Sequence, residues 1–324
     1  MRIFISGGTG NIGQWVSKAL LAAGHDLVLL TRTPDRIPAY RSLPRVTLVK
    51  GNILDLDIME KALIDCDAVV HIALGWGNNP VEMLDHDTRV SLFLVDAAEK
   101  QGVKKFIYTS STAAMGPLRD GMDERAQLLP GNLYGATKAS TEMYLMGFEQ
   151  YYSGQGLNGK KTHITRNVIR PGYTFSNPAF DDGASQSDKQ FLNIAMAALK
   201  GEELTYDRLA GTQFLSARQI AELYVKLVES DLNKETFLAL GTRFISWVDI
   251  ARLTVELSQS SSKVIISDTD PARSPSYYSV RKMGKVFGLS FRGDEDLTEH
   301  VQWNISRARK ILANETVSDP YHVW

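Results

Sequence analysis

The stretch RIFISGGTGNIG, residues 2–13, opens the chain and decides the fold expected for everything after it. Residues 2–6 are a short apolar run typical of a buried strand, and residues 11–24, NIGQWVSKALLAAG, follow as an amphipathic segment typical of a helix. Gly7, Gly10 and Gly13 lie between them at three-residue spacing. A glycine turn that follows a strand and opens a helix is the pattern that binds the pyrophosphate of a dinucleotide.

Each glycine of this turn has a separate expected role. Gly7 permits the tight turn, Gly10 lets the backbone approach the pyrophosphate, and Gly13 lets helix and strand pack closely. A plain turn between strand and helix is the alternative, but it needs only one or two glycines. The lysine and hydroxyl ending of a nucleoside-triphosphate loop is absent, which disfavours phosphoryl transfer. The predicted pyrophosphate-binding residues are Gly7, Thr9, Gly10, Asn11, Ile12 and Gly13.

In the first half of the chain, strand-like segments alternate with helix-like segments, which predicts an α/β fold with a doubly wound parallel sheet. After Pro171 this alternation ends, and predicted helices are mixed with irregular polar stretches, which predicts a smaller C-terminal substrate lobe. The expected division is a dinucleotide-binding domain at residues 1–172, to which 212–245 return, and a lobe made of 173–211 and 246–324.

Composition sets the broad class of protein. The chain has 324 residues, is 44% hydrophobic, and balances 36 basic against 37 acidic residues. No block of one charge sign indicates a nucleic-acid or lipid surface. One cysteine, Cys66, rules out an internal disulfide framework, and from the pattern of apolar residues we expect neither a leader nor a membrane-spanning run. We expect a cytoplasmic enzyme with a small-molecule substrate and with no nucleic-acid or membrane partner.

The end of the second expected strand bears on which dinucleotide is bound. An acid about twenty residues beyond the glycine turn favours NAD, whereas an arginine suits the extra phosphate of NADP. Strand DLVLLT ends at Thr31 and Arg32 follows, which favours NADP(H); NAD(H) is the alternative, with Arg32 a solvated cation and Asp35 holding the ribose. Later strand ends are expected to flank the rest of the cofactor, at Asn52, Ile53 and Ala73.

Tyr134 and Lys138 are four residues apart in a helical segment, so both project from one face. A nearby ammonium and a cationic nicotinamide ring favour the phenolate form of a tyrosine, which makes it useful in proton transfer. A lysine there can also hold ribose hydroxyls. Tyr278 and Lys282 share the spacing, but no strand ending in hydroxyl residues precedes them, so we treat them as a chance match.

Four hydroxyl residues, 109–112, end the strand before Tyr134, at the edge of the sheet where ligands gather. Ser111 is the residue we expect to orient and polarise a substrate carbonyl. Ser110 and Thr112 are its nearest competitors, and the simpler interpretation is that all four only cap the strand end.

The motifs GGTGNIG, FIYTSS and YGATK occur in the order and spacing of the extended short-chain dehydrogenase/reductases, the epimerase/dehydratase superfamily, which residues 1 to about 175 resemble. The resemblance implies a Rossmann domain, a catalytic set of Ser111, Tyr134 and Lys138, and a homodimer through helices 83–101 and 134–150. It also places Pro171 beside the nicotinamide.

The departures from the family pattern narrow the substrate class. Family dehydratases carry an Asp-Glu pair where residues 112–115 read TAAM. Nucleotide-sugar epimerases carry an asparagine where Tyr173 stands and an arginine where residues 212–214 read TQF. Asp87 replaces the family's common helix asparagine. Trp76 and Tyr173 are expected to form an apolar wall for a smaller carbonyl compound, with Ser111 contacting the substrate oxygen.

Together these observations predict an NADP(H)-dependent reductase or dehydrogenase of a small carbonyl or alcohol, with no metal site. One rival is a nucleotide-sugar epimerase that retains its cofactor through turnover. The other is a non-catalytic sensor that binds NADP as a signal; a broken Ser-Tyr-Lys set would favour it, and here the set is intact.

Overall fold

The computed structural model describes residues 1–152, 163–180, 189–268, 270 and 272–315. Its centre is a seven-stranded sheet in the order β11-β6-β5-β4-β1-β2-β3, with every neighbouring pair parallel. This is the doubly wound order, because the chain runs outward from β1 in one direction and then resumes beside it in the other. The strands are β1 Arg2–Ser6, β2 Asp26–Thr31, β3 Val46–Lys50, β4 Ala68–His71, β5 Lys105–Thr109, β6 Thr165–Pro171 and β11 Thr236–Ala239.

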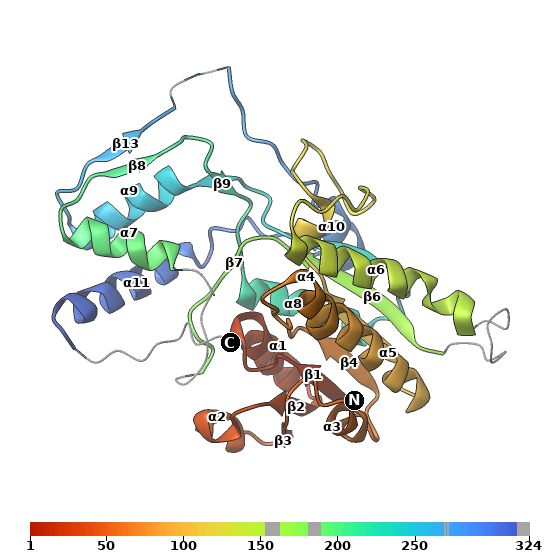
Figure 1. The fold of residues 1–324 in the computed structure, drawn as a ribbon. Coiled ribbons are helices and arrows are strands. Elements are labelled where there is room, and N and C mark those ends of the chain that lie inside the picture. The colour runs from red at the N-terminus through yellow and green to blue at the C-terminus, as the bar shows by residue number, and fades with distance from the viewer. Residues whose placement is uncertain (153–162, 181–188, 269, 271, 316–324) are drawn as a thin grey trace.

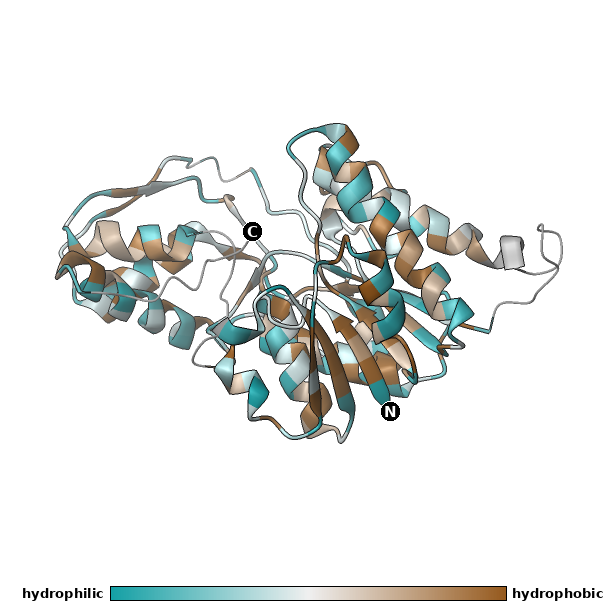
Figure 2. Cartoon of the chain, turned by 60° about the horizontal axis from the view of Figure 1, so that its bottom comes forward, coloured by the Kyte–Doolittle hydropathy of each residue, from teal (hydrophilic) through white to brown (hydrophobic). Residues whose placement is uncertain are grey.

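Helices cover both faces of this sheet (Figure 1). One face packs against a first group of helices: α1 Asn11–Ala22, α2 Pro38–Arg41, α8 Ala217–Glu229 and α10 Arg281–Phe287. The other face packs against a second group: α3 Leu56–Ala62, α5 Val90–Lys100 and α6 Leu133–Tyr152. Figure 2 shows the strands as a hydrophobic layer between helices that turn polar faces outward. Burial on both faces explains why the strands are almost continuously apolar.

The remaining helices and short strands pack around a separate hydrophobic cluster, on the left of Figure 1. The helices are α7 Gln190–Leu199, α9 Trp247–Ser258 and α11 Leu297–Leu312, and the paired strands are β8 Leu204–Tyr206 with β13 Val264–Ile266. Short pairs join this part to the sheet: β7 Thr174–Phe175 with β10 Leu215–Ser216, and β9 Gly211–Thr212 with β12 Ile245–Ser246. Phe191 and Phe214 are buried at the centre of the cluster.

Three short helical segments shape the region beyond the carboxyl ends of the strands. A 3₁₀ turn, η1 Pro34–Arg36, follows β2, and another, η3 Thr112–Met115, follows β5. Between α4 Pro80–Met83 and α5 lies a π-helical turn, η2 Leu84–Arg89. Single π turns inside helices are rare and occur frequently at functional sites. No described helix combines the length and the apolar character needed to cross a membrane.

Candidate functional site

Two glycines of the first turn are required by the packing of the chain itself. Gly7 has φ +74°, and a Cβ on it would lie 2.6 Å from the backbone nitrogen of Ala73. A Cβ on Gly13 would lie 1.9 Å from the carbonyl oxygen of Gly7. Both contacts are far inside van der Waals distance, so the turn closes only with glycine at these positions.

Gly10 differs from them, because a Cβ there would meet nothing nearer than the Gly7 oxygen at 3.4 Å. It sits at the N-terminus of α1 with φ −77°, no side chain caps this end of the helix, and no acidic residue lies in its first turn. The space before Gly10 is therefore open, and the backbone N–H groups behind it suit an anion. Thr9 lies within the turn, and Asn11 and Ile12 begin α1, where the Asn11 amide oxygen accepts a hydrogen bond from the Ser176 hydroxyl; their contact with a pyrophosphate stays a prediction.

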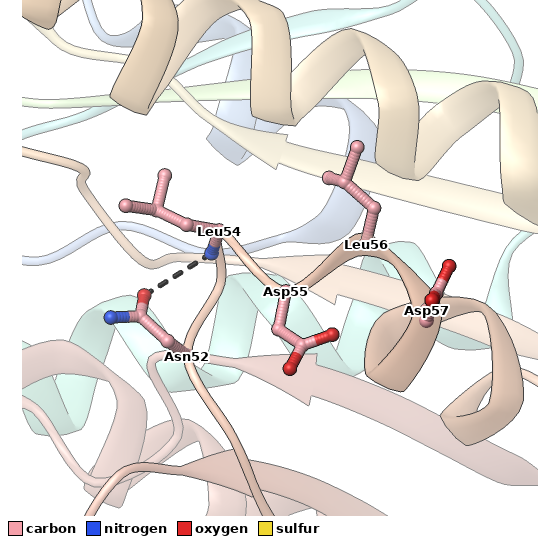
Figure 3. Close-up of a pocket in the computed structure, with 5 residues that line it drawn as sticks. All are labelled: Asn52, Leu54, Asp55, Leu56 and Asp57. Atoms are coloured by element: carbon pink, nitrogen blue, oxygen red, sulfur yellow. Dashed lines mark hydrogen bonds between the residues drawn. The ribbon is translucent and has the colours of Figure 1, made fainter.

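The predicted adenosine side lies beyond β2 and β3. Arg32 is exposed, and no hydrogen bond or ion pair of its side chain is found within the described part of the chain. Asp35 pairs with Arg41 instead of turning toward a ribose position. Asn52 is exposed beyond β3, and its amide oxygen accepts a hydrogen bond from the Leu54 nitrogen at 3.1 Å, in the shallow hollow of Figure 3. Ile53 is half-buried against the core.

The first turns of α6 carry the predicted tyrosine and lysine. The Lys138 Nζ is 5.9 Å from the ring centroid of Tyr134 and 5.2 Å from that of Tyr108. The indole of Trp76 lies beside the Tyr134 ring at 6.4 Å between centroids, and it is 55% exposed, so it can contact a ligand. Gly135 allows this approach of α6 to η3, because a Cβ there would be 2.3 Å from the Ala113 oxygen.

The four hydroxyl residues at the end of β5, 109–112, differ in their hydrogen-bond partners. Thr109 is hydrogen-bonded to the Tyr224 hydroxyl at 2.5 Å, and Ser110 donates to the buried carboxylate of Glu142. Burial raises the pKa of Tyr278, and the nearby Thr112 side chain opposes that shift. Ser111, the remaining hydroxyl, accepts from the Ala113 nitrogen at 3.1 Å and caps η3, so its own proton has no acceptor within the described residues. Thr109 and Ser110 are therefore committed to the core, whereas Ser111 keeps a proton that it can donate to a ligand.

Lys138 is buried against a carboxylate that sequence reasoning noted only as a replaced asparagine. The Nζ lies 3.4 Å from Asp87 Oδ1, and the exposed fractions of the two side chains are 3% and 1%. Burial opposes the ammonium, but the oxygens of Tyr108 and Asp87 outweigh it and raise the pKa of Lys138 above its ordinary value. The π turn of η2 places Asp87 there.

A buried histidine connects this turn to the glycine turn, and nothing in the sequence pattern singled it out. His71 ends β4; its Nδ1 lies 2.6 Å from the Ser6 hydroxyl and its Nε2 lies 2.8 Å from the Ser91 hydroxyl. Ser91 donates to the Asp87 carbonyl at 2.7 Å, so we infer that Nε2 carries the imidazole proton. Burial lowers the pKa of His71 to about 3, with a further contribution from Lys138, so the ring is neutral. A polar residue inside an apolar strand was the available signal.

A second buried pair stands beside the site without facing it. Arg170 and Glu142 are 2.6 Å apart, with side chains 5% and 3% exposed, and the Arg170 Nη1 also donates to the Glu124 carbonyl. Ser110 completes the shell of the Glu142 carboxylate. The arrangement anchors α6 to β6, and Pro171 is the last, buried residue of that strand.

The structure does not bring all predicted residues together. Tyr173 packs edge-on against Phe214 at 4.8 Å and Trp247 at 5.5 Å, in the aromatic cluster of the C-terminal part, while Trp76 packs on Tyr134. Tyr278 lies outside any helix, and Lys282 binds Glu235 at 2.5 Å. Their spacing therefore gives Tyr278 and Lys282 no shared face.

Two features define a class of dinucleotide-binding protein. One is a doubly wound sheet with an open glycine turn at the start of α1, and the other is a hydroxyl, a phenol and an ammonium beyond β5. The NAD dependent epimerase/dehydratase family model matches residues 3–239. The chain belongs to this family.

Relatives within this family carry different names. The photosystem II assembly factor Ycf39 of Synechocystis is 31% identical over 82% of this chain and 70% of its own. Cinnamoyl-CoA reductase 2 of Arabidopsis thaliana is 32% identical over 36% of this chain and 38% of its own. UDP-glucuronic acid 4-epimerase of Bacillus cereus, solved with NAD, superposes with a TM-score of 0.77 at 18% identity, covering 98% and 99% of the two chains. This last likeness concerns the fold alone.

Proposed function

We propose that the protein is an NADP(H)-dependent reductase or dehydrogenase of a small carbonyl or alcohol. The observation that carries the proposal is the grouping of the Tyr134 phenol, the Lys138 ammonium and the Ser111 hydroxyl, the last with its proton uncommitted, beyond the end of β5. Trp76 adds an exposed apolar surface next to the phenol.

The bound nicotinamide would supply or accept the hydride. In reduction, the Ser111 hydroxyl donates a hydrogen bond to the carbonyl oxygen and polarises the bond. As the carbonyl carbon gains the hydride and its electron pair, the Tyr134 Oη gives its proton to the oxygen, which becomes the alcohol. Lys138 would hold ribose hydroxyls of the bound cofactor, and its ammonium stabilises the phenolate that remains, which then recovers a proton from water. Oxidation of the alcohol reverses each transfer.

A nucleotide-sugar epimerase is the weaker proposal for this site. Gln213, in the segment where such epimerases carry an arginine, is buried and donates to the carbonyls of Gly241 at 2.9 Å and Tyr278 at 3.1 Å. A neutral amide committed to backbone groups cannot pair with a pyrophosphate. Tyr173, in place of the epimerase asparagine, is likewise packed among aromatic rings.

The preference for NADP(H) rests on Arg32. A guanidinium pairs with a ribose 2′-phosphate through charge-assisted, often bidentate hydrogen bonds, and NAD has no such phosphate. The side chain is exposed directly after β2, while the nearby acid Asp35 is paired with Arg41.

The test is a turnover screen of a carbonyl panel with NADPH and NADH, followed by titration of both cofactors against Arg32→Ala. Charge-assisted bonds contribute roughly 1.5–3 kcal/mol, so the variant should bind NADPH about one to two decades more weakly and NADH almost unchanged. Arg41→Ala, which removes an exposed arginine of the same region that is paired with Asp35, is the matched control. A wild type that prefers NADH, or a variant that loses both cofactors equally, would contradict the assignment. Binding of NADPH without turnover of any carbonyl would favour a non-catalytic sensor.

We further propose a cytoplasmic homodimer that pairs through residues 83–101 and 134–150, with 173–211 and 246–324 as the substrate lobe. Large apolar side chains on and beside these helices are more than half exposed, which suits a protein interface. They are Val81, Leu84, Met143, Tyr144 and Met146. Met146→Glu should shift the sedimentation coefficient toward that of a monomer.

A further inference from the structure

Asp87 is a buried carboxylate whose hydrogen-bonding capacity is only half used. Oδ1 receives the Lys138 ammonium at 3.4 Å and the Gly75 N–H at 3.4 Å. Oδ2 has no hydrogen-bond partner within the described residues, although it is shielded from solvent. A carboxylate in such surroundings is costly unless its charge is compensated, and Lys138 supplies the compensation.

The groups around Lys138 and Tyr134 come from several elements and differ in charge. His71, on β4, is neutral because burial lowers its pKa to about 3. Burial raises the pKa values of Tyr108, on β5, and Tyr224, on α8, so both remain neutral phenols. The neighbouring pair of Glu142 and Arg170 compensates itself. Among these described groups, the full charges that remain near Tyr134 are therefore the Lys138 ammonium, 5.9 Å from its ring centroid, and the Asp87 carboxylate paired with that ammonium.

A lone ammonium beside a phenol favours loss of the phenolic proton, whereas an ammonium paired with a carboxylate exerts a weaker field. We propose that Asp87 is a positioning residue that fixes Lys138 and offsets its charge, so that Tyr134 retains its proton and serves as the donor to a carbonyl oxygen. This inference rests on the proposed function, because it assigns the same site to the reducing direction.

The position of Asp87 is itself fixed relative to the cofactor cradle. Its backbone carbonyl accepts from Ser91, which is linked through His71 to Ser6 at the end of β1. Gly75 brings the loop that carries Trp76 against the same turn, since a Cβ on it would lie 1.9 Å from the His86 oxygen. The carboxylate is thus held between the glycine turn and the loop that carries Trp76.

The experiment follows phenol ionisation in the free protein by near-ultraviolet difference absorbance, with no cofactor or substrate present. Each protein is measured against the same protein carrying Tyr134→Phe, which isolates the one phenol. Asp87→Asn should lower the pH of half-ionisation by on the order of one unit, because it leaves the ammonium unopposed. Asp85→Asn is the matched control, because Asp85 lies on the same turn but pairs with Arg89 at 3.2 Å in solvent.

A second comparison removes the risk that a lone buried ammonium prevents folding. Lys138→Gln alone keeps the Asp87 charge, and Asp87→Asn/Lys138→Gln carries neither charge. The double variant should ionise at a pH about one unit lower than Lys138→Gln. Equal titration curves within either comparison would overturn the role of Asp87. A shift without turnover of any carbonyl would uphold the role of Asp87 and remove the proposed reductase activity, so the two failures are distinguishable.

Discussion

At the scale of single residues, the site depends on which side chains remain uncommitted. Burial and internal hydrogen bonds occupy Thr109 and Ser110, and they leave Ser111 and Thr112. A sequence pattern can place four hydroxyls at a strand end, but it cannot tell which of them the core uses. The tertiary contacts of β5 with α6 and α8 make that distinction.

Replacing Tyr134 with Phe should remove the proton donor and leave the glycine cradle intact. We expect turnover to fall by roughly two to four decades, the usual cost of losing a general acid, with cofactor affinity nearly unchanged. Steady-state rates with any carbonyl that the wild type reduces, together with a cofactor titration, check this. Tyr278→Phe is the control. If Tyr278→Phe abolished turnover while Tyr134→Phe kept it, our choice between the two tyrosines would be wrong.

Alanine substitutions of Ser111 and Ser110 should differ in which property they reduce most, turnover or stability. Ser111→Ala should lower turnover, because its hydroxyl serves the ligand, and should also cost about 1 kcal/mol of stability, because the same hydroxyl caps η3. Ser110→Ala should lower the free energy of unfolding by about 1–3 kcal/mol, because it leaves a buried Glu142 oxygen short of a donor. Chemical denaturation and turnover, measured on both variants, separate the roles. A larger turnover loss at Ser110 than at Ser111 would contradict the assignment.

At the scale of elements, the first βα unit and α6 follow from local sequence rules. The glycine turn opens α1 as expected, and Gly24 and Gly102 have φ +91° and +77° just beyond α1 and α5, where a left-handed glycine commonly ends a helix. The π turn was not predicted. No local sequence rule marks residues 84–89 as a π turn, and in the structure Asp87 of this turn contacts Gly75 and Lys138.

Two glycines of α6 offer a test of how closely that helix packs against η3. A Cβ on Gly135 would lie 2.3 Å from the Ala113 oxygen, whereas a Cβ on Gly147 would meet nothing within 4 Å. Gly147→Ala should therefore stabilise the fold by up to about 1 kcal/mol, the usual gain in helix propensity. Gly135→Ala should destabilise it and reduce turnover, because α6 must move away from η3. Equal melting temperatures for the two variants would contradict this account of α6.

At the scale of the whole molecule, the sheet and its order were predictable because alternating strands and helices permit few topologies. The packing of the C-terminal part was not, since its aromatic cluster joins residues far apart in sequence, such as Tyr173 and Trp247. The placement of Tyr173 within this cluster depends on contacts that no local pattern encodes.

Stability of the whole fold should decrease in acid because two histidines are buried as neutral rings. Burial lowers the pKa values of His71 and His300 to about 3, from 6.5. The unfolded chain then binds more protons between these pH values, so stability is lost as pH falls through the window, by about 1.4 kcal/mol per pH unit for each histidine. Urea denaturation at several pH values measures this slope. His300→Gln should make the slope shallower, the exposed His163→Gln should leave it unchanged, and equal slopes in all three proteins would contradict the prediction.

A π-helical turn holds one more residue than an α-helical turn, so η2 amounts to a single-residue insertion between α4 and α5. Each residue of an α-helix advances the chain by about 100° around the axis. Deleting one residue within Leu84–Arg89 would let the segment become regular and would rotate α4, with the Trp76 loop, by about that angle relative to Asp87. The number of residues in η2 therefore determines which side chain meets Lys138. A relative with one residue fewer in this turn would turn a different face of the helix toward the lysine, even if an aspartate aligned with Asp87.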